Sequence, residues 1–492
     1  MGGCMRKQRL KKIATILLTG IWLFFGLCAL AGCKKESKGY TRYEITAEYA
    51  PENRTLAGTA KVTYQHGGGS TSVLKFQLYP NAYRKDALYS PVGTGQTAAA
   101  YYAGESYGEM VISSVNGAKS WEVMGEDENI LYVHLPETLF EGDKVVLDIG
   151  FLTKLAKVRH RTGITEKTVN LGNFYPILCG VKNGGFYETV YYADGNPFFS
   201  DCADYSLQLT LPKEYTVVSS GWREAERVLE SKKVYTASGG ELRDFAITLS
   251  RAFRSVEQEI NGKEIVYYYC EDETPEDTLS VAAQAFAYYE KTFGAYPFER
   301  YTVVETGLCL DFASYSCLLM VSENLSKEAR VQAIAEGMAR QWWYGVVGCD
   351  QIENGWQSEG LSAYAAASFF ETHPDYGLSR EKIVTESLKE YRSYYDVYGS
   401  VLGRTDTRMN KHLSEFVSGY EYRCLSRDKA LVMLDTLRKS VGDKKFYAGL
   451  RRYYNGNRFL TADAGALIGA FEKAGVDAYG FFDGFLSGKG IL

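Results

Sequence analysis

The chain has 492 residues, of which 46% are hydrophobic and 23% are charged. This length supports two or more packed domains, and an aromatic content of 14% excludes a disordered chain. The formal net charge is −5, and neither a basic patch nor a nucleic-acid-binding motif follows the N-terminal segment. We therefore expect no nucleic-acid partner.

The N-terminal segment has the features of an export signal. Five basic residues between positions 6 and 12 precede an apolar run over residues 13–30. The run ends in Leu-Ala-Gly-Cys at residues 30–33, which resembles the bacterial lipobox, whose Cys becomes the lipidated first residue. The sequence thus predicts a lipoprotein signal peptide over 1–33 with lipidation at Cys33, and a polar tether over 34–41. We expect an exported protein, lipid-anchored to the outer face of the bacterial cell membrane; an ordinary membrane anchor is the alternative.

The remaining cysteines do not suggest a disulfide framework. Seven are scattered over the chain after Cys33, without paired spacing, and their odd number leaves at least one unpaired (179, 202, 270, 309, 317, 349 and 424). Most are expected to be small buried hydrophobic residues.

The hydrophobic pattern divides the rest of the chain into two domains. Over residues 42–254, apolar residues alternate with polar ones in short runs such as 60–64, 74–78, 145–149 and 205–211. This period of two predicts many short strands, and hence a β-saddle or sandwich domain. Residues 255–492 predict a mostly helical domain, so the fold class is α+β, multidomain.

Helix signals are clear in the second domain. Thr274 and Pro275 suit an N-cap and a first helical position, and Gly294 suits the end of that helix. Strands are predicted over 265–270 and 301–305, and Ser326 is the predicted N-cap of the next helix.

This next helix carries the most specific motif. Residues 341–345 read Gln-Trp-Trp-Tyr-Gly, Trp356 follows, and residues 359–361 read Glu-Gly-Leu. The pattern resembles the M1 family of zinc aminopeptidases, which write His-Glu-x-x-His-Gln-Trp-Trp-Tyr-Gly and then a Glu separated from the second His by eighteen residues. The resemblance covers about residues 40–490 and implies a β saddle followed by a thermolysin-like domain.

The residues that carry the family's chemistry are missing. Matched to the pattern, the two His fall on Glu336 and Arg340, the general-base Glu falls on Gly337, and only the third zinc ligand survives, as Glu359. Two further family positions are changed as well. The Glu that holds a substrate's α-amine corresponds to Ser314, and the Tyr that stabilises the oxyanion corresponds to Ser426.

Zinc is therefore not expected, and no other cofactor is. An arginine has no lone pair to offer a metal, and glycine cannot accept a proton from water. The five His, at 66, 134, 160, 373 and 412, include no pair spaced three or four apart. A register shifted by one residue would keep Glu336 as the base, but it also lacks both His ligands.

The replacements suggest an ion-pair cluster. Glu336 and Arg340 are spaced i, i+4 with the acid first, which favours a helical ion pair, and Glu359 should face them from the next helix. We expect Arg340 to occupy the former zinc position and to bridge both carboxylates. A solvated surface pair is the alternative.

These residues predict a membrane-tethered, catalytically inactive member of the M1 fold that binds a peptide or a protein in the cleft between its domains. Two alternatives remain open. One is an active zinc aminopeptidase with atypical ligands, and the other is a structural subunit of an envelope complex.

Overall fold

The computed structural model describes residues 40–403 and 405–490. The expected signal peptide, Cys33 and most of the expected tether lie outside these residues. Within the described ranges, no helix has both the length and the apolar character that crossing a bilayer requires. The seven cysteines of the same ranges are all unpaired, and five of them are buried.

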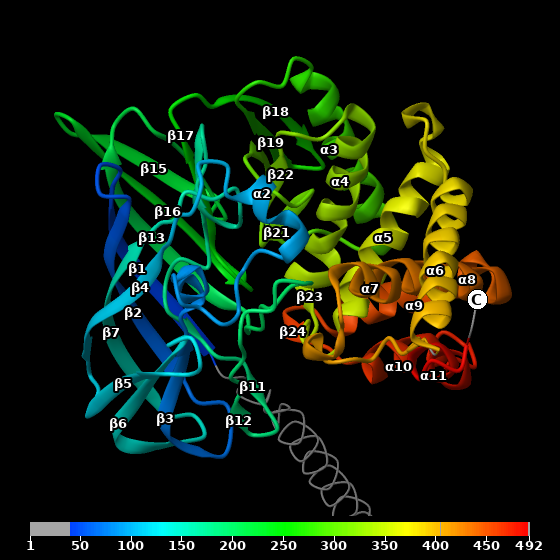
Figure 1. The fold of residues 1–492 in the computed structure, drawn as a ribbon, viewed down its shortest axis with the longest axis horizontal. Coiled ribbons are helices and arrows are strands. Elements are labelled where there is room, and N and C mark those ends of the chain that lie inside the picture. The colour runs from blue at the N-terminus through cyan, green and yellow to red at the C-terminus, as the bar shows by residue number, and fades with distance from the viewer. Residues whose placement is uncertain (1–39, 404, 491–492) are drawn as a thin grey trace, which may run out of the picture.

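The N-terminal half is built on a seven-stranded sheet, on the left of Figure 1. Its order is β15 (Arg223–Val228), β16 (Lys232–Leu242), β13 (Ala203–Pro212), β1 (Tyr40–Ala50), β2 (Thr55–Gln65), β7 (Lys144–Lys154) and β4 (Glu109–Asn116). Strand β1 pairs parallel with β13 and antiparallel with β2, so the first described strand is the central one. Its Tyr43, Ile45, Ala47 and Tyr49 all face the core, as the period of two predicts.

Smaller sheets complete this half. One has the order β10 (Ile177–Leu178), β3 (Ser70–Gln77), β6 (Ile130–Phe140) and β5 (Ser120–Met124). Another has the order β14 (Thr216–Ser219), β17 (Ala246–Ser250), β9 (Thr168–Gly172) and β8 (Thr162–Ile164). A short hairpin pairs β11 (Val181–Lys182) with β12 (Gly185–Phe186).

The C-terminal half opens with a five-stranded sheet and continues in helices, on the right of Figure 1. The sheet order is β18 (Arg254–Ile260), β19 (Lys263–Tyr269), β20 (Arg300–Thr306), β22 (Leu318–Ser322) and β21 (Phe312–Tyr315). The longer helices are α3 (Pro275–Phe293), α4 (Lys327–Arg340), α5 (Gly355–Thr372), α6 (Arg380–Leu402), α8 (Ala430–Val441), α9 (Asp443–Gly456), α10 (Ala464–Glu472) and α11 (Tyr479–Leu486). The β-rich half followed by the helical half confirms the expected fold class.

Local chemistry explains where the two helices nearest the site begin. Ser326 caps α4 as predicted, since its hydroxyl accepts a hydrogen bond from the Ala329 amide at 3.3 Å. Helix α3 starts at Pro275, but the Thr274 side chain makes no capping bond. The buried Asp272 carboxylate accepts the Thr274 amide instead, at 3.0 Å, and the Thr278 hydroxyl at 2.6 Å.

The tryptophans of the signature segment are structural. Trp342, Trp343 and Trp356 are at most 2% exposed, as expected for core residues. The Trp342 indole donates to the Gly294 carbonyl at 2.8 Å, which joins the end of α4 to the end of α3. This packing fixes the direction of the helix that carries the candidate site.

Candidate functional site

A cleft of about 510 Å³ lies where the β-rich half meets α4 and α5. Both halves contribute to its lining: Arg161 and Asn196 come from loops of the β-rich half, Phe312 from β21, Glu336 and Arg340 from α4, Glu359 from α5, and Arg427 from the π-helical segment η6 (Arg423–Lys429). The three positions that correspond to the family's zinc ligands are therefore brought together in one cavity.

The Arg340 and Glu359 side chains form a buried ion pair in this cleft. Arg340 is 7% exposed and Glu359 is 6% exposed, and a guanidinium nitrogen of Arg340 donates to Glu359 Oε2. The Arg340 guanidinium also lies over the Phe312 ring, 5.2 Å from its centre. Burial opposes the charge of Arg340, but the adjacent Glu359 carboxylate raises its pKa above the ordinary arginine value.

The other oxygen of Glu359 is occupied as well. Oε1 accepts the Asn196 amide at 2.8 Å and the Tyr422 hydroxyl at 3.2 Å. Burial and the Glu359 charge raise the pKa of Tyr422 well above its usual range, so this hydroxyl remains a proton donor. The one carboxylate that matches a zinc ligand is thus held by three donors of the protein itself.

Glu336 has a different partner from the expected one. Its carboxylate is held by Arg427, whose Nε lies 2.9 Å from Oε1 and whose terminal nitrogen lies 2.7 Å from Oε2. Arg427 also donates to Asp428 at 2.6 Å. The expected bridge by Arg340 is therefore wrong for Glu336 and confirmed for Glu359: two arginines share the two acids, one each.

The residues at the other changed family positions have structural contacts. The Ser314 hydroxyl donates to the Gly337 carbonyl at 3.1 Å and accepts the Gln341 amide at 3.2 Å, which ties β21 to α4. Gly337 lies against Leu319, and a Cβ at this position would come within 3.1 Å of the Phe312 ring. Ser426 is 1% exposed.

This donor set does not fit a zinc ion. In the part of the chain that the structure describes, no three His, Cys, Asp or Glu side chains form a group that could hold a metal. Arg340 neutralises the charge of Glu359, the one carboxylate that matches a zinc ligand. The permanent positive charge of Arg340 beside it would repel a zinc ion. Gly337 offers no base, and Ser314 offers no carboxylate as an anchor for an α-amine.

Three lining residues of this cleft, Arg161, Asn196 and Arg427, were not indicated by the sequence, and Tyr422, which donates to Glu359, is out of register with the family's tyrosine. Asn196 and Arg161 lie outside regular strands and had no periodic signal. Tyr422 sits at the junction of α7 (Gly419–Tyr422) and η6, and its position depends on the π-helical turn that follows. For Arg427, the sequence signal was its position beside the oppositely charged Asp428, just ahead of an apolar helix.

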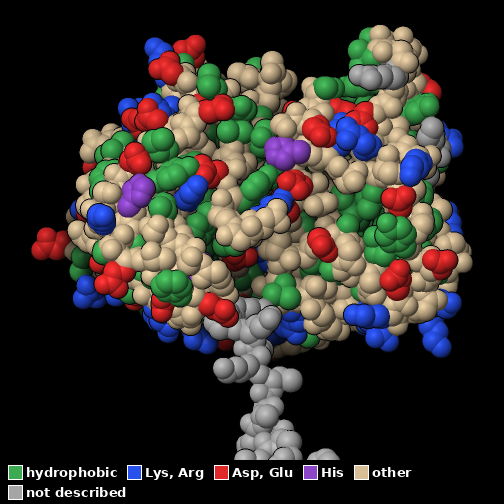
Figure 2. Space-filling model, turned by 90° about the horizontal axis from the view of Figure 1, so that it is seen from below, with side chains coloured by type: hydrophobic (Ala, Val, Ile, Leu, Met, Phe, Trp, Pro, Cys, Tyr) green, Lys and Arg blue, Asp and Glu red, His purple; other side chains and the backbone are tan. Residues whose placement is uncertain are grey.

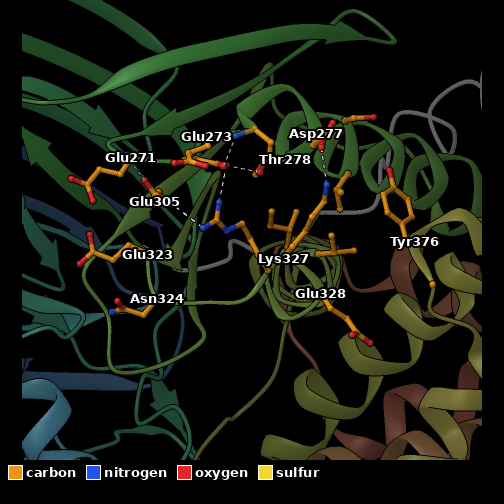
Figure 3. A pocket seen from close by; sticks show the side chains of 18 of the residues that line it. Glu271, Glu273, Asp277, Thr278, Glu305, Glu323, Asn324, Lys327, Glu328 and Tyr376 are labelled. Atoms are coloured by element: carbon orange, nitrogen blue, oxygen red, sulfur yellow. Dashed lines mark hydrogen bonds and ion pairs between the residues drawn. The ribbon is translucent and has the colours of Figure 1, made fainter.

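A second, larger cavity lies at the opposite end of α4. It measures about 1090 Å³, and acidic side chains outnumber basic ones in its lining. Figure 3 shows Asp277 and Thr278 of α3 beside Lys327 of α4. Lys327 pairs with Asp277 at 2.8 Å, and Arg330 with Asp272 at 2.8 Å. Because these charges are paired across the helices, we assign this cavity no role in the chemistry of the cleft.

The charged groups of the surface are mixed. Figure 2 shows one face of the molecule on which lysine, arginine, aspartate and glutamate side chains are interspersed over both halves. The cleft differs from this face, because four arginines are grouped in its lining (161, 340, 423 and 427).

Comparison with known proteins agrees with this architecture. The Peptidase family M1 domain matches residues 278–485. Among solved structures, the M1 zinc metallopeptidase from Deinococcus radiodurans is similar over 93% of this chain and 96% of its own, with a TM-score of 0.65 and 15% identity.

A mutant of the same enzyme bound to a Tyr-Ser-Ala substrate gives a TM-score of 0.64 over 92% of this chain and 96% of that chain, at 16% identity. A two-domain M1 zinc metallopeptidase mutant bound to L-tryptophan gives 0.62 over 93% and 96%, at 14% identity. No curated protein matches the chain by sequence. Residues 278–485 thus match a peptidase family M1 domain, and the chain has the fold of the two-domain M1 metallopeptidases.

Proposed function

We propose that this protein is a lipid-anchored pseudopeptidase, which binds a peptide or an extended protein segment in its cleft and does not hydrolyse it. The observation that carries the proposal is the Arg340–Glu359 ion pair, which occupies two of the positions that the sequence resemblance assigns to zinc ligands. With Glu359 saturated by protein donors, zinc is not expected to be recruited, and no other cofactor is implied.

The cleft itself supports a binding role. Its volume of about 510 Å³ is suited to a short peptide stretch, and its walls come from both halves of the chain. The related enzyme from Deinococcus radiodurans has been captured with a Tyr-Ser-Ala tripeptide. Loss of the metal donors leaves such a cleft without a hydrolytic group while its walls remain.

The test combines metal analysis, turnover and binding on the full chain purified in detergent. We expect no stoichiometric zinc, no turnover of aminoacyl-p-nitroanilides, and saturable binding of tripeptides such as Tyr-Ser-Ala. Turnover that a chelator abolishes would instead establish an active aminopeptidase with atypical ligands. Stoichiometric capture of a protein partner that cleft variants leave unchanged would favour a structural subunit.

Membrane attachment is a separate part of the proposal. It rests on the charged segment, apolar run and Leu-Ala-Gly-Cys ending of residues 6–33. Cys33→Ala should abolish incorporation of labelled fatty acid, and exported protein should fail to fractionate as a lipoprotein. Unchanged lipid labelling in this variant would refute the assignment of Cys33.

A further inference from the structure

Arg161 is a buried cation without a carboxylate partner. Its side chain lines the cleft next to Asn196, yet the residue is only 6% exposed. One terminal nitrogen donates to Asn196 Oδ1 at 2.8 Å and weakly to the Gly195 carbonyl at 3.4 Å. The other terminal nitrogen has no hydrogen-bond partner among the described residues.

The groups around Arg161 are neutral. Its guanidinium lies 5.5 Å from the centre of the Phe198 ring. Burial raises the pKa of Tyr191 above its usual range and that of Tyr83 well above it, so neither is a tyrosinate at neutral pH. Burial and the Arg161 charge lower the pKa of His160 well below 6.5, so this imidazole is uncharged too.

The two buried acids of the same cleft are already neutralised. Glu359 pairs with Arg340, and Glu336 pairs with Arg427. Asp311 also lines the cleft, but it is exposed to solvent and forms no ion pair within the described residues. A buried guanidinium without a counter-charge is costly, so an anion from outside the protein would stabilise this arrangement.

We propose that Arg161 receives a carboxylate of the bound peptide. The inference rests on the proposed function and adds the chemical class of the ligand. A carboxylate matches the planar donor fork of a guanidinium and brings the single negative charge that Arg161 lacks. A dianionic phosphate would add a second charge close to Glu359, which Asn196 joins to Arg161 through hydrogen bonds at 2.8 Å on either side.

The first test needs no variant. The binding of acetyl-Ala-Glu-Ala-amide, acetyl-Ala-Ala-Ala and acetyl-Ala-Gln-Ala-amide to the full chain in detergent is measured by calorimetry. The first peptide carries a side-chain carboxylate, the second a C-terminal carboxylate, and the third none. We expect at least one acidic peptide to bind about tenfold more tightly than the neutral one or better. The preferred acidic peptide identifies the source of the carboxylate.

The second test uses Arg161→Gln with Arg159→Gln as the matched control. Arg159 is two positions away, pairs with Glu166 and lines the other cavity, so its loss changes the net charge equally. Arg161→Gln should remove the preference for the acidic peptide, Arg161→Lys should retain part of it, and Arg159→Gln should leave it intact. Unfolding midpoints of all variants establish that they are folded.

The outcomes separate the two proposals. Equal binding of acidic and neutral peptides overturns the role of Arg161 and leaves peptide binding in place. An acidic preference that survives in Arg161→Gln also overturns it. If none of the three peptides binds the wild-type chain, the proposed peptide-binding function falls first, and the assignment of Arg161 falls with it.

Discussion

Arg427 holds both oxygens of the Glu336 carboxylate although 91 positions separate the two residues. The Glu336 side chain is buried and that of Arg427 is 15% exposed, and Arg427 comes from η6 whereas Glu336 comes from the C-terminal half of α4. This pair fastens the segment that carries Tyr422 to the helix that carries the former metal positions. It therefore stabilises the geometry of the cleft that both residues line.

Removing Arg427 should be severe because two acids lose their partner. We expect Arg427→Ala to lower the free energy of unfolding by about 3–5 kcal/mol, since Glu336 remains buried and unpaired and Asp428 keeps only the more distant cation of Arg423. The measurement is urea denaturation. Arg423→Ala is the matched control: this side chain is 60% exposed and lies 3.7 Å from Asp428, so it should cost less than about 1 kcal/mol.

Double-mutant cycles should separate the two ion pairs. Arg340→Ala combined with Glu359→Gln should show a coupling of about 1–3 kcal/mol in urea denaturation, because the two side chains are in direct contact. Arg340→Ala combined with Glu336→Gln should couple by less than about 0.5 kcal/mol. A larger coupling in the second cycle would restore a single arginine bridging both acids.

A glutamate at position 337 should fit only if space is made for its side chain. A Cβ on Gly337 would meet the Leu319 side chain and lie 3.1 Å from the Phe312 ring. Gly337→Ala should therefore destabilise the protein by about 1–3 kcal/mol. In a Leu319→Ala background its cost should shrink.

The comparison substitution is Gly345→Ala, where an added Cβ has its nearest contact at 3.6 Å and should cost little.

The revertant Glu336→His/Gly337→Glu/Arg340→His is then best built together with Leu319→Ala. Its zinc content, measured beside the unaltered chain, shows whether the donor set alone decides metal binding. Equal zinc in the two proteins would contradict the assignment of the site.

Tyr422→Phe should remove one of the three donors to Glu359. Because the acceptor is a buried carboxylate, we expect the free energy of unfolding to fall by about 1–2 kcal/mol. Tyr420→Phe serves as control, since Tyr420 is 41% exposed and its hydroxyl contacts Glu390 at 3.4 Å or more. Similar losses in the two variants would argue against the hydrogen bond to Glu359.

His160 should make stability depend on pH. Its folded-state pKa is lowered well below 6.5, so below about pH 6.5 the unfolded chain binds a proton that the native protein does not. The contribution of His160 to the free energy of unfolding is therefore fully present above the unfolded-state pKa. It decreases as the pH drops below that pKa, by up to about 1.4 kcal/mol per pH unit.

The reference for this measurement is His160→Asn, which keeps an acceptor for the Tyr83 hydroxyl, now 2.6 Å from His160 Nδ1. The stability difference between wild type and variant should shrink from pH 8 to pH 5, measured by urea denaturation at each pH. The other four histidines are common to both proteins and cancel. A constant difference would mean that His160 is not held neutral.

The sequence predicts the parts of this structure that depend on local or periodic signals. Ser326 was recognisable as a cap by its residue type and position, and the strands by their alternation. Arg340 and Glu359 were expected to meet because the resemblance places them at the spacing of two metal ligands. The meeting of α4 and α5 follows from that spacing.

The partners from distant segments were not predictable in the same way. The i, i+4 rule favours Arg340 as the partner of Glu336, but it describes an isolated helix, and Arg427 competes for the same carboxylate from η6. The π-helical turn of η6 changes the helical register, so the sequence match places the family's tyrosine on Ser426, whereas the tyrosine that reaches Glu359 is Tyr422. Asn196 and Arg161 reach the cleft only through the packing of the two halves.

The position of β1 has a mechanical consequence. This strand begins at Tyr40 and runs through the middle of the large sheet, held by β13 on one side and β2 on the other. A force applied to the chain before Tyr40 therefore loads both ladders in shear, so that their hydrogen bonds resist together instead of opening one by one. If residues 1–39 tether the protein to a surface, the first described strand is also its anchor point, and tension between a captured ligand and the tether would enter the fold through this sheet.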